Sequence, residues 1–144
     1  MMSGIKGKDT RPEMLIRRAL HAHGYRYRLH DKKLPGKPDL VFRHYHAVIF
    51  IHGCFWHGHD CHLFKWPSTR AEFWRQKIQR NQEKDADNQH ALKARGWRVL
   101  VVWECTLKGR EKRRITETVA EVSAWLRSQK DFGEITGDTG DGAS

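Results

Sequence analysis

The placement of the cysteines constrains the fold of this 144-residue chain more than any other feature. There are three cysteines, and an odd number excludes a fully paired disulfide framework. Cys54, His59 and Cys61 form a C-x4-H-x-C pattern, and Cys105 follows an apolar run over Arg98–Trp103. Three thiolates and one imidazole are typical of a closed structural zinc site. The pattern therefore predicts a zinc ion that joins a polar loop to the end of a distant strand.

The alternative is that the three thiols are buried for packing alone, because free cysteine behaves as a small apolar residue. Zinc is favoured because it uses every cysteine. The choice of the histidine ligand stays open at this stage, since His52, His57 and His62 compete with His59.

The formal net charge of +10 and the pI of about 9.9 favour a polyanionic partner, in most cases nucleic acid. Hydrophobic residues make up 38% of the chain, which is enough for one folded core. The start, residues 1–8, lacks the apolar region of a signal peptide, and no apolar run approaches the ~20 residues that span a bilayer. We therefore expect a soluble cytoplasmic protein.

Apolar periodicity and turn residues predict the order α-β-β-β-α-β-α. The first helix runs from Thr10 to about His23, with a T-x-x-E capping box. A second capping box, Thr69 to Glu72, opens a long helix that ends near Arg95. The other predicted elements are strands over Tyr25–Leu29, Leu40–Phe42, Ala47–Ile51 and Arg98–Trp103, and a last helix that carries Ile115, Val119, Val122 and Leu126.

This order predicts an α/β fold in which a mixed central sheet is flanked by helices. We expect residues 1–132 to form a single domain. Residues 133–144, rich in glycine, aspartate and threonine, are expected to be a disordered tail.

A candidate catalytic centre begins at Asp39, which directly precedes a short strand. Nucleases often place an acidic metal ligand at the head of such a hairpin, and a carboxylate is a hard oxygen ligand for magnesium. The next strand carries neither the acid nor the lysine of the usual arrangement. A backbone carbonyl and a histidine would have to replace them.

Each candidate carboxylate also has a simpler explanation. Asp39 follows a proline and could be a turn residue, an explanation about as good as the metal ligand. Glu13 could serve only as a helix cap, and Asp85 could be a solvated residue on the polar face of the long helix.

Aromatic and basic residues follow the histidine-rich loop. Trp97, Trp103 and Trp125 accompany apolar elements and are expected in the core. Aromatic rings on a basic protein can instead wedge between base pairs or cover a zinc site. The candidates for these roles are Phe55, Trp56, Trp66 and Trp74, with Lys77 one helical turn beyond Trp74 and with Lys65, Arg70 and Arg75 as phosphate contacts.

Together, these segments resemble the very short patch repair (Vsr) DNA mismatch endonucleases, from Met2 to about Arg113. The longest and most specific segment is Val48–His57, which reads VIFIHGCFWH. The others, in order, are Lys8–Thr10 with Glu13, Leu34–Asp39, Phe73–Trp74 with Lys77, Gly96–Leu100 and Val102–Cys105.

The resemblance implies a restriction-endonuclease-like core that nicks one strand 5′ of the T in a T:G mismatch, the product of 5-methylcytosine deamination. Asp39 and the backbone carbonyl of Ile51 would bind magnesium. His57 would be the general acid/base, Asp85 would support it, and Glu13 would organise water at the metal. The resemblance further implies zinc ligands at Cys54, His59, Cys61 and Cys105, and DNA contacts from Phe55, Trp56, Trp74 and Lys77.

Three positions depart from the family pattern. Ile51 stands where threonine is usual, and Asp60 where histidine is frequent. The segment Met2–Ile5 matches only the end of the family's N-terminal arm, which predicts weaker DNA binding.

Two other functions are compatible with the residues: a less specific nuclease of the same core, and a zinc-dependent DNA-binding module without catalysis. The second would need neither Asp39 nor His57. The family resemblance further implies a monomer aided by mismatch-repair proteins and associated with the bacterial nucleoid through its substrate.

Overall fold

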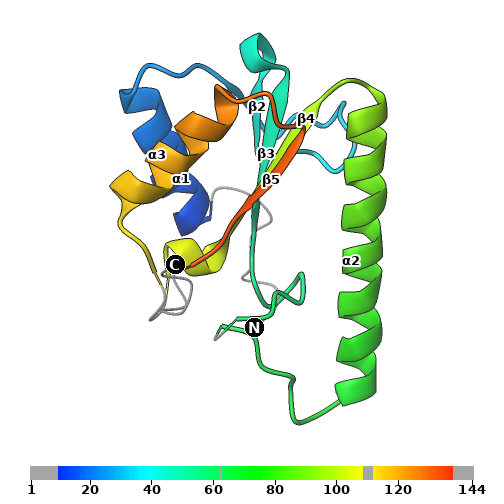
Figure 1. Ribbon diagram of the computed structural model, residues 1–144. Coiled ribbons are helices and arrows are strands. Elements are labelled where there is room, and N and C mark those ends of the chain that lie inside the picture. The colour runs from blue at the N-terminus through cyan, green and yellow to red at the C-terminus, as the bar shows by residue number, and fades with distance from the viewer. Residues whose placement is uncertain (1–9, 62, 109–111, 138–144) are drawn as a thin grey trace.

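A computed structural model describes residues 10–61, 63–108 and 112–137 of the chain (Figure 1). The helices within these ranges are α1 (Arg11–Ala22), α2 (Ala71–Ala94) and α3 (Ile115–Leu126). The strands are β1 (Arg28–Leu29), β2 (Leu40–Phe42), β3 (Ala47–His52), β4 (Arg98–Trp103) and β5 (Phe132–Ile135). Two short 3-10 helices, η2 (Arg43–Tyr45) and η3 (Glu104–Thr106), follow β2 and β4.

The described strands form one five-stranded sheet in the order β1-β2-β3-β4-β5. β1, β2 and β3 pair antiparallel, whereas β3, β4 and β5 pair parallel, so the sheet is mixed as predicted. In the β3–β4 register, Ile51 lies beside Val102 and His52 beside Trp103. The carboxyl ends of β3 and β4 therefore meet at one edge, and the start of β2 reaches the same edge because β2 runs antiparallel to β3.

Helices cover both faces of the sheet. Helices α1 and α3 lie side by side on one face, and α2 crosses the other (Figure 1). The alternating side chains of β3 explain this arrangement, since Ile49 packs in the core with Ile16 of α1 while Val48 packs in the core with Leu92 of α2. A strand that is buried on both faces reads as a continuous apolar run, and β3 does so.

Several predicted elements are confirmed. Helix α3 and strand β4 have the expected bounds, and α1 begins after Thr10, whose side chain accepts the backbone N–H of Glu13 at 3.4 Å. Trp103 and Trp125 are buried in the core, with 8% and 7% of their surface exposed.

Two local predictions were wrong. Helix α2 begins at Ala71, and its N-cap is Arg70 in a left-handed conformation (φ 53°) without a side-chain cap, so the expected capping box at Thr69 does not form. The predicted strand over 25–29 is reduced to Arg28–Leu29. Tyr25 is instead buried in the core, where its hydroxyl bonds to Ser123, because burying the ring outweighs the local strand pattern.

The expected disordered tail was wrong for its first residues. Phe132–Ile135 forms β5 and pairs parallel with β4 through a register that sets Gly133 beside Leu100. Gly133 is suited to this place because an added Cβ would lie 2.7 Å from Trp125 Nε1. The composition of this segment predicted a disordered tail, but close packing against Trp125 of α3 leaves no space for a Cβ and favours glycine. The rest of the expected tail, residues 138–144, lies outside the described residues, as does the arm motif at residues 2–5.

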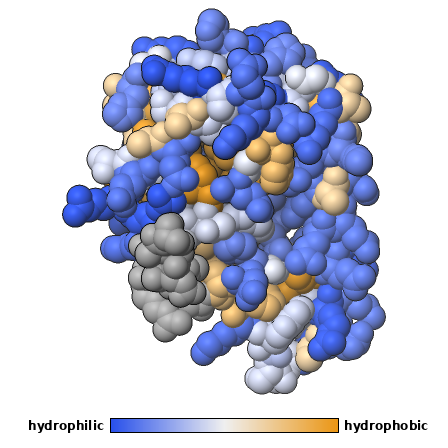
Figure 2. Space-filling view, in the orientation of Figure 1, coloured by the Kyte–Doolittle hydropathy of each residue, from blue (hydrophilic) through white to orange (hydrophobic). Residues whose placement is uncertain are grey.

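No helix in the described part of the chain is both long and apolar enough to cross a membrane. Figure 2 shows a largely hydrophilic face on which apolar residues form small separate patches.

Candidate active site and metal centre

Asp39 lies at the sheet edge where β2 begins and β3 ends. Its Oδ2 accepts the backbone N–H of Ile51 at 2.7 Å. The carboxylate is only 13% exposed, and burial raises its pKa to about 7. The hydrogen bond from Ile51 lowers the pKa, whereas the nearby Glu13 raises it further. A buried carboxylate of this kind is stabilised in its charged form by a cation.

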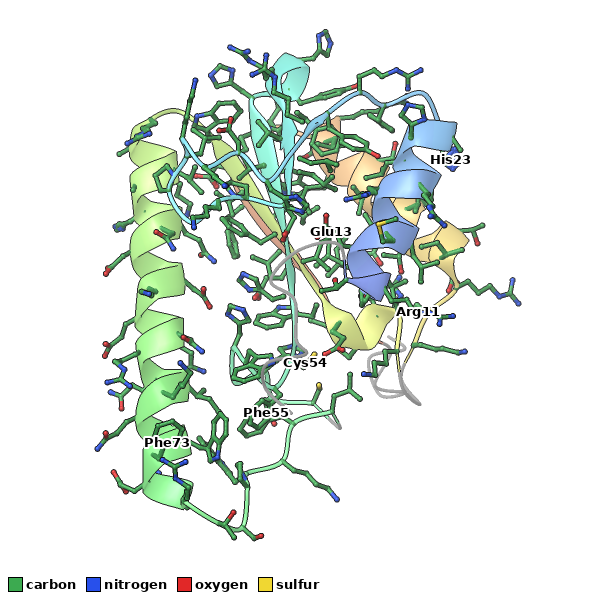
Figure 3. All side chains as sticks on the ribbon, turned by 180° about the vertical axis from the view of Figure 1, so that it is seen from behind. Arg11, Glu13, His23, Cys54, Phe55 and Phe73 are labelled. Atoms are coloured by element: carbon green, nitrogen blue, oxygen red, sulfur yellow. The ribbon has the colours of Figure 1, made fainter. Side chains whose placement is uncertain are left out.

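Glu13 extends from α1 toward the same edge and is 1% exposed (Figure 3). Its Oε2 lies 2.6 Å from His30 Nε2 and 3.0 Å from Arg17 Nη1. Ligand atoms of Glu13, His30 and Asp39 all lie within 4.8 Å of one another. Glu13 and Asp39 were predicted from the sequence, whereas His30 was not. The hairpin register was the available signal, because it lets the His30 N–H donate to the backbone carbonyl of Asp39 at 3.1 Å.

His57 follows β3 and faces α2. Its Nδ1 lies 2.5 Å from Asp85 Oδ2, so the structure brings together the two side chains that the resemblance associates. The carboxylate holds Nδ1 and leaves Nε2 available for another group. Both side chains keep some solvent access, with 23% and 21% exposed.

His52 packs beneath His57 and was considered in the sequence only as a rival zinc ligand. The two rings stack with centroids 3.8 Å apart and planes 4° apart. Burial lowers the pKa of His52 to about 3, so the ring is neutral. Its Nδ1 is buried and lacks a hydrogen-bond partner among the described residues. This nitrogen is a polar atom that a bound water or ligand could satisfy.

A cavity of about 240 Å³ joins the two groups of candidate catalytic residues. Its lining includes Asp39 and Ile51 together with His57 and Asp85. A phosphate group in this cavity would meet both a candidate cation ligand, Asp39, and a candidate proton-transfer group, His57.

The cysteine cluster is formed by the same loop together with Cys105, which follows β4. Ligand atoms of Cys54, His59, Cys61 and Cys105 all lie within 4.8 Å of one another. His52 and His57 belong to a separate group with Asp85, which leaves His59 as the histidine beside the thiols. His62, the remaining rival, lies outside the described residues.

The electrostatics of the cluster suit a soft cation. A hydrogen bond with Cys54 lowers the pKa of Cys105 to about 4, and the same bond, with burial, raises the pKa of Cys54. The lowered pKa of Cys105 favours its thiolate form, which is the form that binds a metal. The Cys105 sulfur also accepts the Gly137 N–H at 3.2 Å, a bond from the segment just beyond β5.

Trp103 covers the histidine of this cluster. Its ring stacks on His59 with centroids 4.2 Å apart and planes 8° apart, and its Nε1 donates to Glu134 of β5 at 3.1 Å. Covering of the zinc site was one of the two roles predicted for the loop aromatics, but this contact comes from Trp103 at the end of a core strand.

The predicted DNA-contacting side chains form one aromatic cluster between the loop and α2. The ring centroids of Phe55, Trp56 and Trp74 lie 5.3–5.8 Å apart. Phe55, Trp56 and Lys77 line an open groove of about 960 Å³, which also touches Ile51, His52 and His57. The groove therefore reaches the candidate catalytic residues.

Helix α2 carries Trp74, Lys77, Asn81 and Asp85 at intervals of three and four residues, which places them on one face. Asn81 donates to the Trp56 carbonyl at 2.9 Å, and Gln82 donates to the His57 carbonyl at 3.1 Å. Sequence reasoning missed both amides, because only the docked helix shows which carbonyls they reach.

Comparisons with known proteins agree with this geometry. The family model described as DNA mismatch endonuclease Vsr matches residues 1–63. The chain is 46% identical over 125 residues to the DNA mismatch endonuclease Vsr of Escherichia coli K12, a match that spans 87% of this chain and 80% of the relative.

The chain is also similar to two type II nicking enzymes. The type II nicking enzyme V.XorIIP of Xanthomonas oryzae is 50% identical over 107 residues, covering 74% of this chain and 79% of the relative. The type II nicking enzyme V.NmeAIP of Neisseria meningitidis is 44% identical over 124 residues, covering 85% and 89%.

Proposed function

Because the chain belongs to the Vsr family of DNA mismatch endonucleases and is therefore a nuclease, we propose that it nicks one strand of duplex DNA 5′ of the T in a T:G mismatch. We further propose that nicking depends on magnesium, that the core is restriction-endonuclease-like, and that a structural zinc ion holds the loop. The single observation that carries the proposal is the cavity shared by Asp39 and the His57–Asp85 pair.

His57 acts as the general acid/base in this proposal. Asp85 holds Nδ1 at 2.5 Å and thereby fixes the ring and its tautomer. Nε2 can then take a proton from the attacking water or return one to the leaving oxygen. His52 supports the ring of His57 from below, and being neutral it does not repel a charged His57.

The residues around Asp39 fit a magnesium ion. Asp39 and the backbone carbonyl of Ile51 would hold it, with Glu13 positioning water nearby. When bound, magnesium neutralises charge on the phosphate. The fit is supported by the buried, crowded carboxylates of Asp39 and Glu13, which are hard oxygen donors that a cation would stabilise. Isoleucine in place of the family's threonine at position 51 leaves the proposed carbonyl ligand intact.

The cysteine cluster fits zinc by its donor set. Cys54, His59, Cys61 and Cys105 would form a closed four-ligand site that links the loop to the end of β4. The catalytic histidine lies between two of these ligands in sequence. A zinc ion would therefore hold the backbone on both sides of His57.

The DNA contacts follow from the groove. Phe55 and Trp56, which line the groove, and Trp74, which packs against both, would wedge between base pairs near the mismatch, and Lys77 would contact base edges. Asn81 fixes the Trp56 backbone, so the wedge is held before DNA arrives.

The test uses two end-labelled duplexes, one with a single T:G pair and one fully matched, incubated with protein and magnesium and resolved on a denaturing gel. We expect a nick 5′ of the T in the mismatched duplex alone. Asp39→Ala and His57→Ala should abolish it, whereas Asp87→Asn, an exposed change on α2, should not. Equal cutting of both duplexes would retain the nuclease and exclude mismatch specificity. Binding without cutting would indicate a DNA-binding module.

A further inference from the structure

We infer that this chain has a second DNA-contacting surface, outside the mismatch site, made of two aromatic rings that each pair with an arginine. We call it the outer aromatic surface and define it by Trp66, Phe73, Arg70, Arg75 and Lys65. The inference rests on the proposed function, because it assumes a DNA duplex in the groove. It adds a contact to duplex that flanks the mismatch.

The exposure of the two rings is the first observation. Trp66 is 52% exposed, the highest fraction among the exposed large hydrophobic residues that the structure describes. Phe73, at 40%, is among the next most exposed. Burying a tryptophan ring is strongly favourable, so a ring left half in water on a folded protein is available to a partner.

The guanidinium groups are the second observation. The Arg75 guanidinium lies 5.5 Å from the centre of the Trp66 ring, and that of Arg70 lies 4.2 Å from the centre of Phe73. The adjacent carboxylate, Glu72, accepts from Gln76 at 3.5 Å. Arg70, Arg75 and Lys65 are all exposed, so the surface is cationic around its rings.

This combination favours nucleic acid over an apolar protein partner. Arginine and lysine contact phosphates, while a ring beside them stacks on a base or packs on a sugar. A purely protective role for the arginines would cover the rings, but Trp66 stays half exposed despite its arginine.

The outer rings are continuous with the inner cluster. Phe64 lies 5.8 Å from Phe55 and 4.8 Å from Trp66, and Phe73 lies 5.2 Å from Trp74, all between ring centroids. DNA held by Phe55 and Trp74 would therefore continue onto the outer rings. Figure 3 shows Phe73 near the first turn of α2 and Phe55 on the facing loop.

The position of Phe73 along α2 determines how far from the nick this contact lies. Phe73 and Asp85 lie roughly 18 Å apart along the helix axis, because an α-helix rises about 1.5 Å per residue. That length corresponds to about five base pairs at roughly 3.4 Å each. The outer aromatic surface should therefore contact one arm of the duplex, up to about five pairs from the nick.

The experiment measures dissociation constants for T:G duplexes shortened one base pair at a time from either end. On the longest duplex, Trp66→Ala and Arg75→Gln should each bind about tenfold more weakly than wild type. When the duplex arm that reaches the outer aromatic surface is too short to touch it, both variants should bind with the wild-type dissociation constant. Arg75→Gln should also lower the slope of log affinity against log salt by about 1.

Matched controls are Leu15→Ala and Arg127→Gln, which change an exposed leucine and an exposed arginine on α1 and at the end of α3. Both should bind as wild type at every length. The single-turnover nicking rate at saturating protein should also stay unchanged in these two control variants. Trp66→Phe should keep most of the affinity, which provides a ring-retaining variant if Trp66→Ala folds poorly.

Wild-type affinity of Trp66→Ala and Arg75→Gln at every length would overturn the inference, as would an equal loss on short and long arms. A wild-type protein that binds but does not nick at T:G would contradict the proposed function, while the length dependence would still decide this inference. A wild-type protein that binds no duplex would overturn both.

Discussion

His57 shows how one residue becomes reactive through its neighbours. An imidazole in a loop after a strand is ordinary, but Asp85 holds one nitrogen of His57 at 2.5 Å and the His52 ring stacks on its face with centroids 3.8 Å apart. The side chain therefore loses its rotational freedom and presents Nε2 in one direction. Preorganisation of this kind lowers the barrier to proton transfer.

We predict that His57→Ala lowers the single-turnover nicking rate by about 10²- to 10⁴-fold, the usual contribution of a general acid/base. Asp85→Asn should lower it by ~10-fold or more, because the amide no longer selects the tautomer. The measurement is product formation at saturating protein on the T:G duplex. Asp87→Asn, a change two residues beyond Asp85 on α2, should keep the wild-type rate. An Asp85→Asn variant with the wild-type rate would exclude Asp85 as a support of His57.

His30 is a second case, in which a residue acts through another. Its Nε2 lies 2.6 Å from the buried carboxylate of Glu13, which in turn lies close to Asp39. Removing His30 would take one hydrogen-bond partner from this buried carboxylate, although Arg17 would still contact it.

We predict that His30→Ala raises the magnesium concentration for half-maximal nicking several-fold and lowers the unfolding free energy by about 1–3 kcal/mol. His30→Gln keeps a side-chain N–H donor and should restore most of the magnesium response. The checks are a magnesium titration of single-turnover rates and urea unfolding without metal. If alanine and glutamine variants titrate identically to wild type, His30 has no positioning role.

At the scale of elements, α2 and β5 position residues of the candidate sites in addition to stabilising the fold. Helix α2 lacks a side-chain cap and has only two buried side chains, Ile78 and Leu92, yet it carries one face of polar and aromatic groups that reach the loop. Asn81 and Gln82 bond to loop carbonyls, so docking of the helix and ordering of the loop depend on each other. Strand β5 supplies Glu134 to Trp103, which stacks on His59.

We predict that Gly133→Ala destabilises the protein by about 1–3 kcal/mol, the usual effect of overpacking. The added Cβ would lie 2.7 Å from Trp125 Nε1 and 3.1 Å from Leu100 Cδ1, so α3 or β4 must shift. Urea unfolding should show a lower midpoint with an unchanged slope. Asp131→Ala, an exposed change just before the strand, should stay within about 0.5 kcal/mol of wild type. Equal stability of the two variants would show that β5 is loosely packed.

At the scale of the whole molecule, one sheet edge organises both candidate metal sites. The parallel ends of β3 and β4 bring Ile51 and His52 beside Val102 and Trp103, and the loop after β3 then returns to Cys105 after β4. The candidate catalytic cavity and the cysteine cluster thus share one short loop. Loss of the cysteine cluster should therefore disturb the candidate catalytic cavity.

We predict that the purified protein holds about one zinc ion per chain and that His59→Ala lowers both zinc content and thermal stability. A loss of 2 kcal/mol or more should reduce the melting temperature by roughly 5 °C or more. The matched variant is His90→Ala, an exposed histidine on α2. Elemental analysis and thermal unfolding of both variants, with and without chelator, make the test. Absence of tightly held zinc from the wild-type protein would rule out this ligand set.

Local sequence determined those features whose physics is local. The bounds of α3 and β4 and the start of α1 follow from apolar periodicity and a capping threonine, which act within a few residues. The cysteine–histidine spacing and the acidic residue before β2 named the candidate donors for the same reason, because the chemistry of a donor belongs to its residue type. Family resemblance then assigned roles to these donors.

Tertiary structure decided what depends on segments far apart in sequence. Strand β5 forms because β4 offers a parallel edge, although the composition of this segment predicts a disordered tail. His30 meets Glu13 only through the hairpin, and His52 meets His57, with Trp103 beside His59, only at the sheet edge. Residue type names the groups that can do chemistry, but their distances and solvation arise only when the folded sheet brings them together.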